Sequence, residues 1–531
     1  MKAVLTRLPI FFALLIMACH SEPSANKKKP ATRPVPGKVN LSDSSLTGSF
    51  SSQSTLRFDS LQLDSFFTAY PSLKPYASDV RRFYRARYEA FAWYDSRGLI
   101  EQAGHLHNRI RNLSGEGINS EYPYSRLLDT LMTNAGTEDR YERLKTELLL
   151  TSLYFYFAEK VWSGLNESVT RKIQWYLPRK KSDYSQWLST YLQSKDSNTL
   201  VKEPVYRQYH LLRTWLQKYM ALAGLDWPKL MLKNTGYQRG DPELIPIKRR
   251  LAELGDLPAQ DTTPLFDTSL VTAIKRFQHR FGLRQDGAIN NLFLSELNVS
   301  PQKRIEQIRV NMERSRWIPD TVSGDYLVIN IPEFKLHFYR SDSLLWDINV
   351  VVGQSLHKTV IFSGSLKNIV FSPYWNVPPG ILKKEVLPAI KKDPSYLARH
   401  HMEWYGNTVR QKPGPWNSLG GVKFLFPNSY AIYLHDTPAK DLFRENSRAF
   451  SHGCIRLGEP LKLAAELLKD NPSWNPEKIA AAAQAGKERW VTLDGSFRVF
   501  ITYFTSWVDK QGQLNFRKDI YNRDQRLAKT L

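Results

Sequence analysis

The sequence predicts a multi-domain α+β protein with a helical scaffold, a small three-helix module and a mostly β domain that carries a lid insertion. The chain has 531 residues, which is more than one hydrophobic core accommodates. Hydrophobic residues make up 42% of it and aromatic residues 12%, enough to build packed domains. Near residue 320 the apolar pattern changes from a helical period to the alternation of strands. Helical and β regions are therefore expected in separate parts of the chain.

The beginning of the chain predicts export. A basic start precedes an apolar run that is too short to span a bilayer and ends in a small residue followed by Cys19. This arrangement resembles a lipobox, so residues 1–19 are expected to be a lipoprotein signal peptide and Cys19 the lipidated N-terminus. A plain signal peptide with a chance cysteine is the alternative. Residues 20–55, rich in Ser, Pro, Lys and Thr, predict a flexible tether.

Residues 56–240 predict a helical scaffold. In residues 80–93 apolar side chains recur at helical spacing with arginines between them, which predicts an amphipathic helix. Residues 148–158 are apolar but too few for a membrane span, so a buried helix is expected there. This region shows no spacing typical of a catalytic group or a metal site.

Residues 241–300 predict a compact three-helix module. A helix over 267–281 begins with Asp267 as its N-cap and ends before Gly282. The stretch AIKRFQHRFGLRQDG, with its tight turn at the final Asp-Gly, resembles the peptidoglycan-binding type 1 domain. The resemblance implies a wall-binding role and assigns no ligand contacts, and a generic helical hairpin is the alternative. Residues 301–319 are expected to form a connecting helix.

Residues 320–510 predict a mostly β domain, because apolar or alternating runs recur between turn residues. Within it, residues 373–420 are irregular, Pro-rich and aromatic, which predicts a lid or substrate loop containing Trp375, Pro378 and Trp416. Residues 511–531 predict a basic C-terminal tail. The expected strands are 326–331, 335–339, 346–352, 368–371, 422–426, 430–434 and 497–503.

The chemistry is expected at Cys454, one of two cysteines in the chain. An attacking thiol needs a base for its proton and donors for the oxyanion, which backbone N–H groups beside a glycine can supply. His452 is close in sequence and His435 ends a predicted strand upstream, and the residues alone leave the choice of base open. A buried apolar filler is the alternative role for a lone cysteine. A zinc site is disfavoured because neither C-x-x-C nor H-E-x-x-H is present, and no metal or organic cofactor is expected.

The segment Ser451-His452-Gly453-Cys454-Ile455-Arg456, preceded by Tyr433-Leu434-His435-Asp436, resembles the active-site signature of L,D-transpeptidases with a YkuD-type catalytic domain. The order of scaffold, wall-binding module, catalytic domain and lid is similar to that of the large periplasmic members. The resemblance implies Cys454 as the nucleophile and His435 as the general base. It implies supporting roles for the N–H groups of Gly453 and Cys454 as oxyanion donors, Tyr433 as a helper, Ser451 and His452 in shaping the site, Arg456 in holding the loop or a substrate carboxylate, and Asp436 as a hydrogen-bond acceptor beside His435.

The implied reaction is cross-linking of peptidoglycan stem peptides. Cys454 opens the L,D bond, releases D-alanine and passes the acyl group to an amine of a second stem, giving a 3→3 link. The alternatives are an L,D-carboxypeptidase with the same site, a different acceptor, and a non-catalytic wall-tethering lipoprotein. The net charge of +23 calls for a polyanionic neighbour, and the export signal favours wall or membrane over nucleic acid. The expected location is the periplasm, lipid-anchored at the outer membrane of a Gram-negative bacterium.

Overall fold

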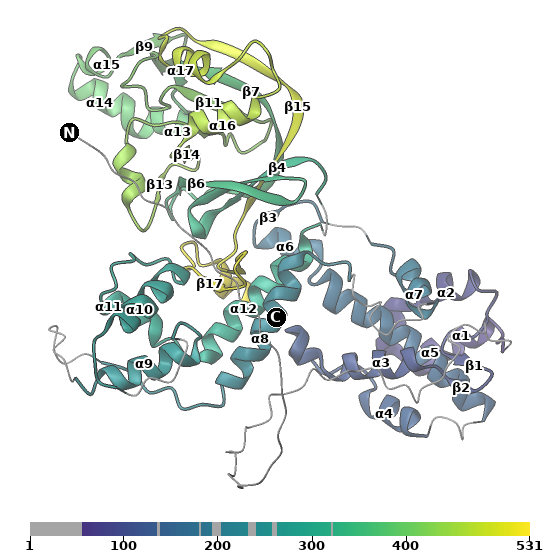
Figure 1. Ribbon diagram of the computed structural model, residues 1–531. Coiled ribbons are helices and arrows are strands. Elements are labelled where there is room, and N and C mark those ends of the chain that lie inside the picture. Colours follow the sequence, from purple (N-terminus) through teal and green to yellow (C-terminus); the bar gives the residue numbers. More distant parts are fainter. Residues whose placement is uncertain are drawn as a thin grey trace, which may run out of the picture. The chain divides into compact units, whose positions relative to one another are not determined.

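The computed structural model describes residues 56–134, 139–179, 182–193, 203–231, 241–257, 263–319 and 322–531. The part of the chain before residue 320 is mainly helical, and the part after it carries the large sheet (Figure 1). The predicted signal peptide and tether, with Cys19, lie outside the described residues. Among the described helices, none is both long enough and apolar enough to cross a membrane.

The scaffold region is helical, as predicted. Its helix α5 (Arg140–Phe157) is capped by Asp139, whose carboxylate accepts the amides of Tyr141 and Glu142 at 2.8 Å. Residues 148–158 are all buried, which confirms the predicted buried helix. The other helices of this region are α1 (Leu61–Ala69), α2 (Ala77–Arg85), α3 (Glu101–Arg111), α4 (Ser125–Thr133), α6 (Glu167–Lys172), α7 (Tyr184–Gln193) and α8 (Arg207–Leu222).

The predicted helix over residues 80–93 is wrong in its second half. Helix α2 ends at Arg85, and Tyr88 and Glu89 then take φ values of 55° and 53°, which a right-handed helix cannot include. The following segment is instead fixed by a buried carboxylate. The amides of Ala92 and Trp93 donate to Glu147 of α5 at 2.5 and 3.0 Å. A tertiary hydrogen bond therefore overrides the local helical pattern here.

The three-helix module is present, with α9 (Leu244–Glu253), α10 (Thr268–Arg280) and α11 (Asn291–Leu297). The carboxylate of Asp267 accepts the Leu270 amide at 2.8 Å, and Gly282 has a φ of 65°, so both predicted ends of α10 are confirmed. The predicted connecting helix is α12 (Pro301–Trp317), with Ser300 as its N-cap. The module's buried apolar residues include Leu251, Leu270, Ile274, Phe277, Phe293, Leu294 and Leu297.

The catalytic-region sheet closes on itself. Its strands run in the order β11-β12-β14-β6-β5-β4-β15-β7-β3, and β11 also pairs with β7. The predicted strand over 430–434 is largely wrong, because Ala431 has a φ of 53° and only a two-residue β12 follows. The strands are β3 (Trp175–Tyr176), β4 (Asp325–Asn330), β5 (Lys335–Arg340), β6 (Ser343–Gly353), β7 (Ile361–Phe371), β11 (Val422–Leu425), β12 (Leu434–His435), β14 (Ile455–Leu457) and β15 (Arg489–Thr502), with β13 (Ala449–Ser451) beside β6 and helices α16 (Pro460–Leu467) and α17 (Pro476–Gln484) following β14.

The lid region was predicted to be irregular, and that prediction is wrong. The region folds around a small apolar core of its own. Strands β8 (Trp375–Asn376), β10 (Thr408–Gln411) and β9 (Met402–Tyr405) form a separate sheet. Short helices α13 (Pro379–Ile381), α14 (Leu387–Lys392) and α15 (Tyr396–Arg399) lie between β8 and β9 in the chain (Figure 1). The strands were too short to give a sequence signal. The core of the lid consists of Val377, Val386, Met402 and Val409.

The C-terminal segment is not a free basic tail. It forms β16 (Ser506–Val508), β17 (Leu514–Phe516) and α18 (Arg523–Ala528), and Tyr521 and Leu527 are fully buried. The guanidinium of Arg523 donates to the Ile173 carbonyl at 2.6 Å, which attaches the segment to the end of α6. The prediction from charge alone missed that aromatic and aliphatic residues recur between the basic ones.

Candidate active site

Three strands place Lys423, His435 and Arg456 in one row across the sheet. Lys423 of β11 pairs with His435 of β12, and His435 pairs with Arg456 of β14. Directly paired residues share a face of a sheet, and the neighbouring row alternates to the other face. That second row, Phe424, Leu434 and Ile455, is fully buried in the core. His435 therefore lies between two cationic side chains, on the face opposite the core.

Cys454 joins this face beside Tyr433. The amide of Ile455 donates to the Tyr433 carbonyl at 3.1 Å, so the parallel pairing of β12 and β14 continues back to these two residues. The thiol is half-buried and donates to the Ala431 carbonyl at a sulfur–oxygen distance of 3.7 Å. Burial raises the pKa of Cys454, while Tyr433, Lys423 and Arg456 act to lower it. The resting cysteine is thus a thiol that needs a base to become a nucleophile.

His435 has the tautomer and protonation state of a base. Its Nδ1–H donates to the backbone carbonyl of Asp436 at 2.5 Å. A carbonyl oxygen only accepts, so Nδ1 carries the proton and Nε2 carries the lone pair. Burial, then Arg456 and Lys423, lower the pKa of His435 to about 3, so the ring is neutral near pH 7. Asp436 acts on the ring through its carbonyl, because its carboxylate accepts the Gly421 amide and pairs with Lys440.

His452 points elsewhere. Its side chain is 41% exposed, and its Nε2 lies 3.2 Å from a carboxylate oxygen of Glu385 in the lid region. Its ring also lies beside that of His357, with ring centroids 5.0 Å apart. His435, by contrast, is only 5% exposed. The structure thus separates the two candidate bases, and His452 contacts the lid region.

The loop that carries Cys454 is held by its own hydrogen bonds. The Ser451 hydroxyl donates to the Cys454 carbonyl at 2.5 Å and accepts the Gly453 amide at 3.1 Å. The Thr359 hydroxyl donates to the Gly453 carbonyl at 2.9 Å. Gly453 has a φ of 115°, a backbone conformation that favours glycine. The Gly453 amide, which is expected as an oxyanion donor, donates to the Ser451 hydroxyl in this structure.

Comparison with models of known protein families finds a match over the residues of this site. The model described as the L,D-transpeptidase catalytic domain of the YkuD type matches residues 324–479, which include Cys454, His435 and both flanking cations. The chain carries an L,D-transpeptidase catalytic domain. A scaffold domain matches residues 78–216, and a domain described as “Putative peptidoglycan binding domain” matches residues 240–297. Both matches fall on the helical region and the three-helix module predicted from the sequence.

Parts of this chain are similar to individual proteins of known sequence or structure. A Haemophilus influenzae protein named “Putative L,D-transpeptidase” is 32% identical over an alignment of 242 residues that covers 42% of this chain. The chain spans about half of that relative, 49% of its length. Among solved structures, an L,D-transpeptidase of Stackebrandtia nassauensis is 15% identical with a TM-score of 0.22, covering 51% of this chain and 97% of that one. L,D-transpeptidase 1 of Mycobacterium tuberculosis is 14% identical with a TM-score of 0.17, covering 34% and 63%.

One of the three predicted lid residues lies beside the candidate active site. The Trp375 side chain lies close enough to Tyr433 to lower the pKa of that hydroxyl, whereas burial and Cys454 raise it. Pro378 precedes α13, where its carbonyl accepts the Leu382 amide at 2.9 Å. Trp416 is 44% exposed and stacks on His401 with ring centroids 3.8 Å apart. The sequence therefore identified the right segment, but only Trp375 is placed beside a residue that neighbours Cys454.

The sequence reasoning missed Lys423, Thr359 and Tyr521. Lys423 did carry a signal, because it alternates with the apolar Val422 and Phe424 and so had to face away from the core. The sequence around Thr359 and Tyr521 gave no signal that these residues support the site. The Tyr521 hydroxyl contacts the Thr359 amide at 3.3 Å, across a separation that no local pattern spans.

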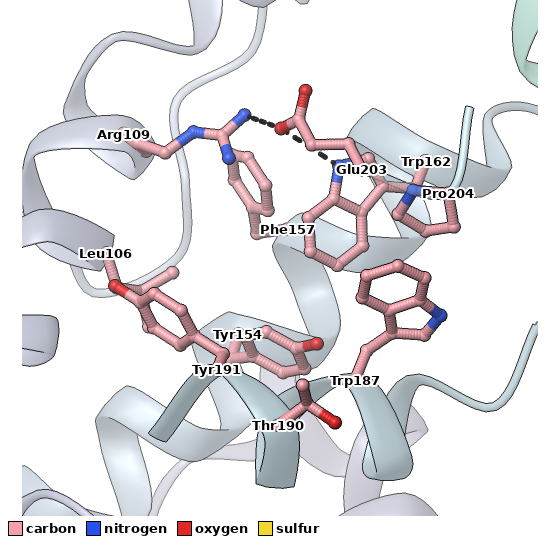
Figure 2. Close-up of a pocket in the computed structure, with 10 residues that line it drawn as sticks. All are labelled: Leu106, Arg109, Tyr154, Phe157, Trp162, Trp187, Thr190, Tyr191, Glu203 and Pro204. Atoms are coloured by element: carbon pink, nitrogen blue, oxygen red, sulfur yellow. Dashed lines mark hydrogen bonds and ion pairs between the residues drawn. The ribbon is translucent and has the colours of Figure 1, made fainter. Parts of the chain in front are cut away.

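Other candidate sites lie outside this constellation. An aromatic pocket in the scaffold has Arg109 and Glu203 at its edge, already joined as an ion pair (Figure 2). None of its lining residues comes from the strands beside Cys454. In the described part of the chain, no group of three or more His, Cys, Asp or Glu residues is placed to hold a metal ion. The pocket is lined by Leu106, Arg109, Tyr154, Phe157, Trp162, Trp187, Thr190, Tyr191, Glu203 and Pro204.

Proposed function

We propose that this protein is a peptidoglycan L,D-transpeptidase that forms 3→3 cross-links through a Cys454 thioester. The observation that carries the proposal is the state of His435: a buried, neutral imidazole whose Nδ1–H is fixed on the Asp436 carbonyl, on the sheet face that Cys454 joins. Such a ring accepts a proton at Nε2 and returns it later. The matched domain supports the same reaction class.

In the first acyl transfer, Cys454 Sγ attacks the carbonyl carbon of the third stem residue, in its bond to the terminal D-alanine. The thiol proton passes to His435 Nε2 as the S–C bond forms. When the tetrahedral intermediate collapses, the C–N bond breaks, and Nε2 gives its proton to the departing amine. D-alanine leaves, and a thioester on Cys454 remains.

In the second transfer, the side-chain amine of another stem's diamino acid attacks the thioester carbon. His435 Nε2 takes a proton from this amine and delivers it to the sulfur as the C–S bond breaks. The products are a 3→3 peptide bond and the regenerated thiol. A thioester reacts readily with amines, so exclusion of water decides between cross-linking and hydrolysis. The lid region, which contacts the site through Trp375 and Glu385, is suited to that exclusion.

The developing oxyanion needs donors other than the Gly453 amide. Two groups adjoin the sulfur: the amide of Cys454 itself and the hydroxyl of Tyr433. We assign the oxyanion contact to these two, because the Gly453 hydrogen is used within the loop. Among the described residues none is a hydrogen-bond partner of the buried Arg456 Nε, and a substrate carboxylate would provide one.

The setting of the reaction is proposed from the sequence and the module. Lipidation at Cys19 would anchor the protein in the periplasm at the outer membrane, and the tether would let the domains reach the wall. The peptidoglycan-binding domain would hold the catalytic domain near its stems. The positive net charge favours the carboxylate-bearing stems.

The test is incubation of the purified full-length protein with disaccharide-tetrapeptide, followed by mass spectrometry. A dimer that lacks one D-alanine, formed by the wild type and not by Cys454→Ala, is the expected result. Tripeptide monomer without dimer would replace the proposal with an L,D-carboxypeptidase. Unchanged substrate with a folded protein would instead favour a wall-tethering role without chemistry.

A further inference from the structure

Lys423 lies on the same sheet face as His435, close to the ring of Tyr433. Its Nζ lies 4.1 Å from the centroid of the Tyr433 ring, on the side of the sheet that Cys454 joins. It pairs with His435 on one side and with the buried Val370 of β7 on the other. The next residue in this row is Trp490 of β15, which pairs with Val370. The ammonium is thus held over the face of the Tyr433 ring.

The charge of Lys423 has no partner of its own. In the described part of the chain, neither Lys423 nor Arg456 forms an ion pair with a carboxylate. Glu488 is the acidic group that acts on Lys423, but its two oxygens accept the Tyr374 amide at 2.8 Å and the Trp490 indole at 3.1 Å. Partial burial of a cation without a counter-ion costs free energy of folding. A negative charge that appears near Lys423 during function would offset this cost.

The groups that face Lys423 are His435 on β12 with Tyr433 just before that strand, Arg456 on β14 with Cys454 just before that strand, and Glu488 before β15. Of these, His435 is neutral and Arg456 is cationic. Tyr433 keeps its proton, because burial raises its pKa. The sulfur of Cys454 is the group that becomes negative when the reaction starts.

We propose that Lys423 is a positioning residue for the nucleophile, whose ammonium stabilises negative charge on the Cys454 sulfur as the thiol loses its proton. This inference rests on the proposed function, since it gives Lys423 a role in the ionisation that function requires. Lys423 acts through space and across the Tyr433 ring, and forms no bond in the reaction.

Lys423 and Arg456 both lower the pKa values of Cys454 and His435, but to different extents. Lys423 lowers the pKa of Cys454 more than Arg456 does, whereas Arg456 lowers the pKa of His435 more than Lys423 does. Lys423 therefore favours the ionised sulfur, and Arg456 keeps the imidazole unprotonated until the thiol delivers its proton. A Cys–His pair with a strongly buried histidine needs both effects, because burial disfavours both charged forms.

The experiment measures the rate of Cys454 alkylation by iodoacetamide against pH, read at the Cys454 peptide by mass spectrometry so that Cys19 does not contribute. Wild type is compared with Lys423→Met, with Lys423→Arg, and with Lys367→Met, an exposed lysine of the neighbouring β7. Loss of a nearby cation is expected to raise the apparent pKa of Cys454 by about one unit in Lys423→Met, roughly a tenfold slower alkylation near pH 7. Lys423→Arg and Lys367→Met are expected to keep the wild-type profile.

An unchanged profile in Lys423→Met would overturn the inference. If Lys423→Met does not fold, as judged by circular dichroism, Lys423→Gln replaces it, because Gln keeps a polar head without the charge. Alkylation needs no stem peptide, so this result is independent of the proposed function. A shifted profile in a protein that makes no cross-link would retain the role of Lys423 and reject only the transpeptidase.

Discussion

The hydroxyl of Tyr521 donates to the Gly353 carbonyl at 2.5 Å, although the two residues are 168 positions apart in the sequence. Gly353 ends β6, and its amide donates to the Thr359 hydroxyl at 2.9 Å. That hydroxyl in turn donates to the Gly453 carbonyl, directly before Cys454. The C-terminal segment and the nucleophile loop are therefore parts of one buried hydrogen-bond network.

Tyr521→Phe tests this network. The substitution keeps the buried ring and removes the hydroxyl, so the Gly353 carbonyl loses its donor and the Thr359 amide loses its acceptor. Unpaired buried polar groups are expected to lower the free energy of unfolding by about 1–3 kcal/mol. Urea unfolding of the two proteins measures the difference.

The matched control is Tyr405→Phe in the lid region, where the side chain is 55% exposed. Its loss is expected to stay within about 0.5 kcal/mol. Equal stability of Tyr521→Phe and wild type would mean that the C-terminal segment does not support the loop.

The pH dependence of stability follows from His435. Its pKa of about 3 in the folded protein lies below the ordinary value of 6.5, so the unfolded chain binds more protons between those values. The neutral ring's contribution is full above pH 6.5 and is lost as pH falls toward 3. At about 1.4 kcal/mol per pH unit, this group alone costs roughly 2–3 kcal/mol between pH 6.5 and pH 4.5.

Urea unfolding of wild type and His435→Asn at these two pH values measures that share. The difference in stability between pH 6.5 and pH 4.5 is expected to shrink in His435→Asn, because Asn does not titrate but still donates to the Asp436 carbonyl. Identical losses in both proteins would show that His435 is not held neutral.

Local patterns predicted what depends on neighbouring residues in the chain. Helix α10 was predicted at both ends because Asp267 and Gly282 fix those ends through their own backbone neighbours. Cys454 and His435 were predicted because each stands in a short continuous motif, residues 451–456 and 433–436. The fold of the lid and the packing of Tyr521 escaped prediction, since short strands and a lone aromatic residue gain their structure only from distant partners. The separation of His435 from His452 also required the strand register.

Arg456→Met is expected to move the acid limit of activity upward. Arg456 pairs with His435 in the strand register, and its guanidinium disfavours the imidazolium. Removing the guanidinium therefore raises the pKa of His435 by roughly one unit. The pH profile of kcat/KM should then lose activity at a higher pH on its acid side. Arg456→Lys keeps the charge and serves as the control. A profile that changes only in height would assign Arg456 to substrate binding alone.

His435→Asn and His452→Asn are expected to differ strongly in the rate of D-alanine release at pH 7. Removing a general base costs about 10²–10⁴-fold, so His435→Asn should lose most of the activity. His452 Nε2 lies 3.2 Å from a Glu385 carboxylate oxygen in a half-exposed contact, and exposed pairs of this kind contribute only about 0–1 kcal/mol, so His452→Asn should lose less than about tenfold. Both variants keep an amide in place of the ring, which matches them in size. The larger loss in His452→Asn would mean that the base is the histidine beside the lid, and that the buried ring of His435 only fills its place in the sheet.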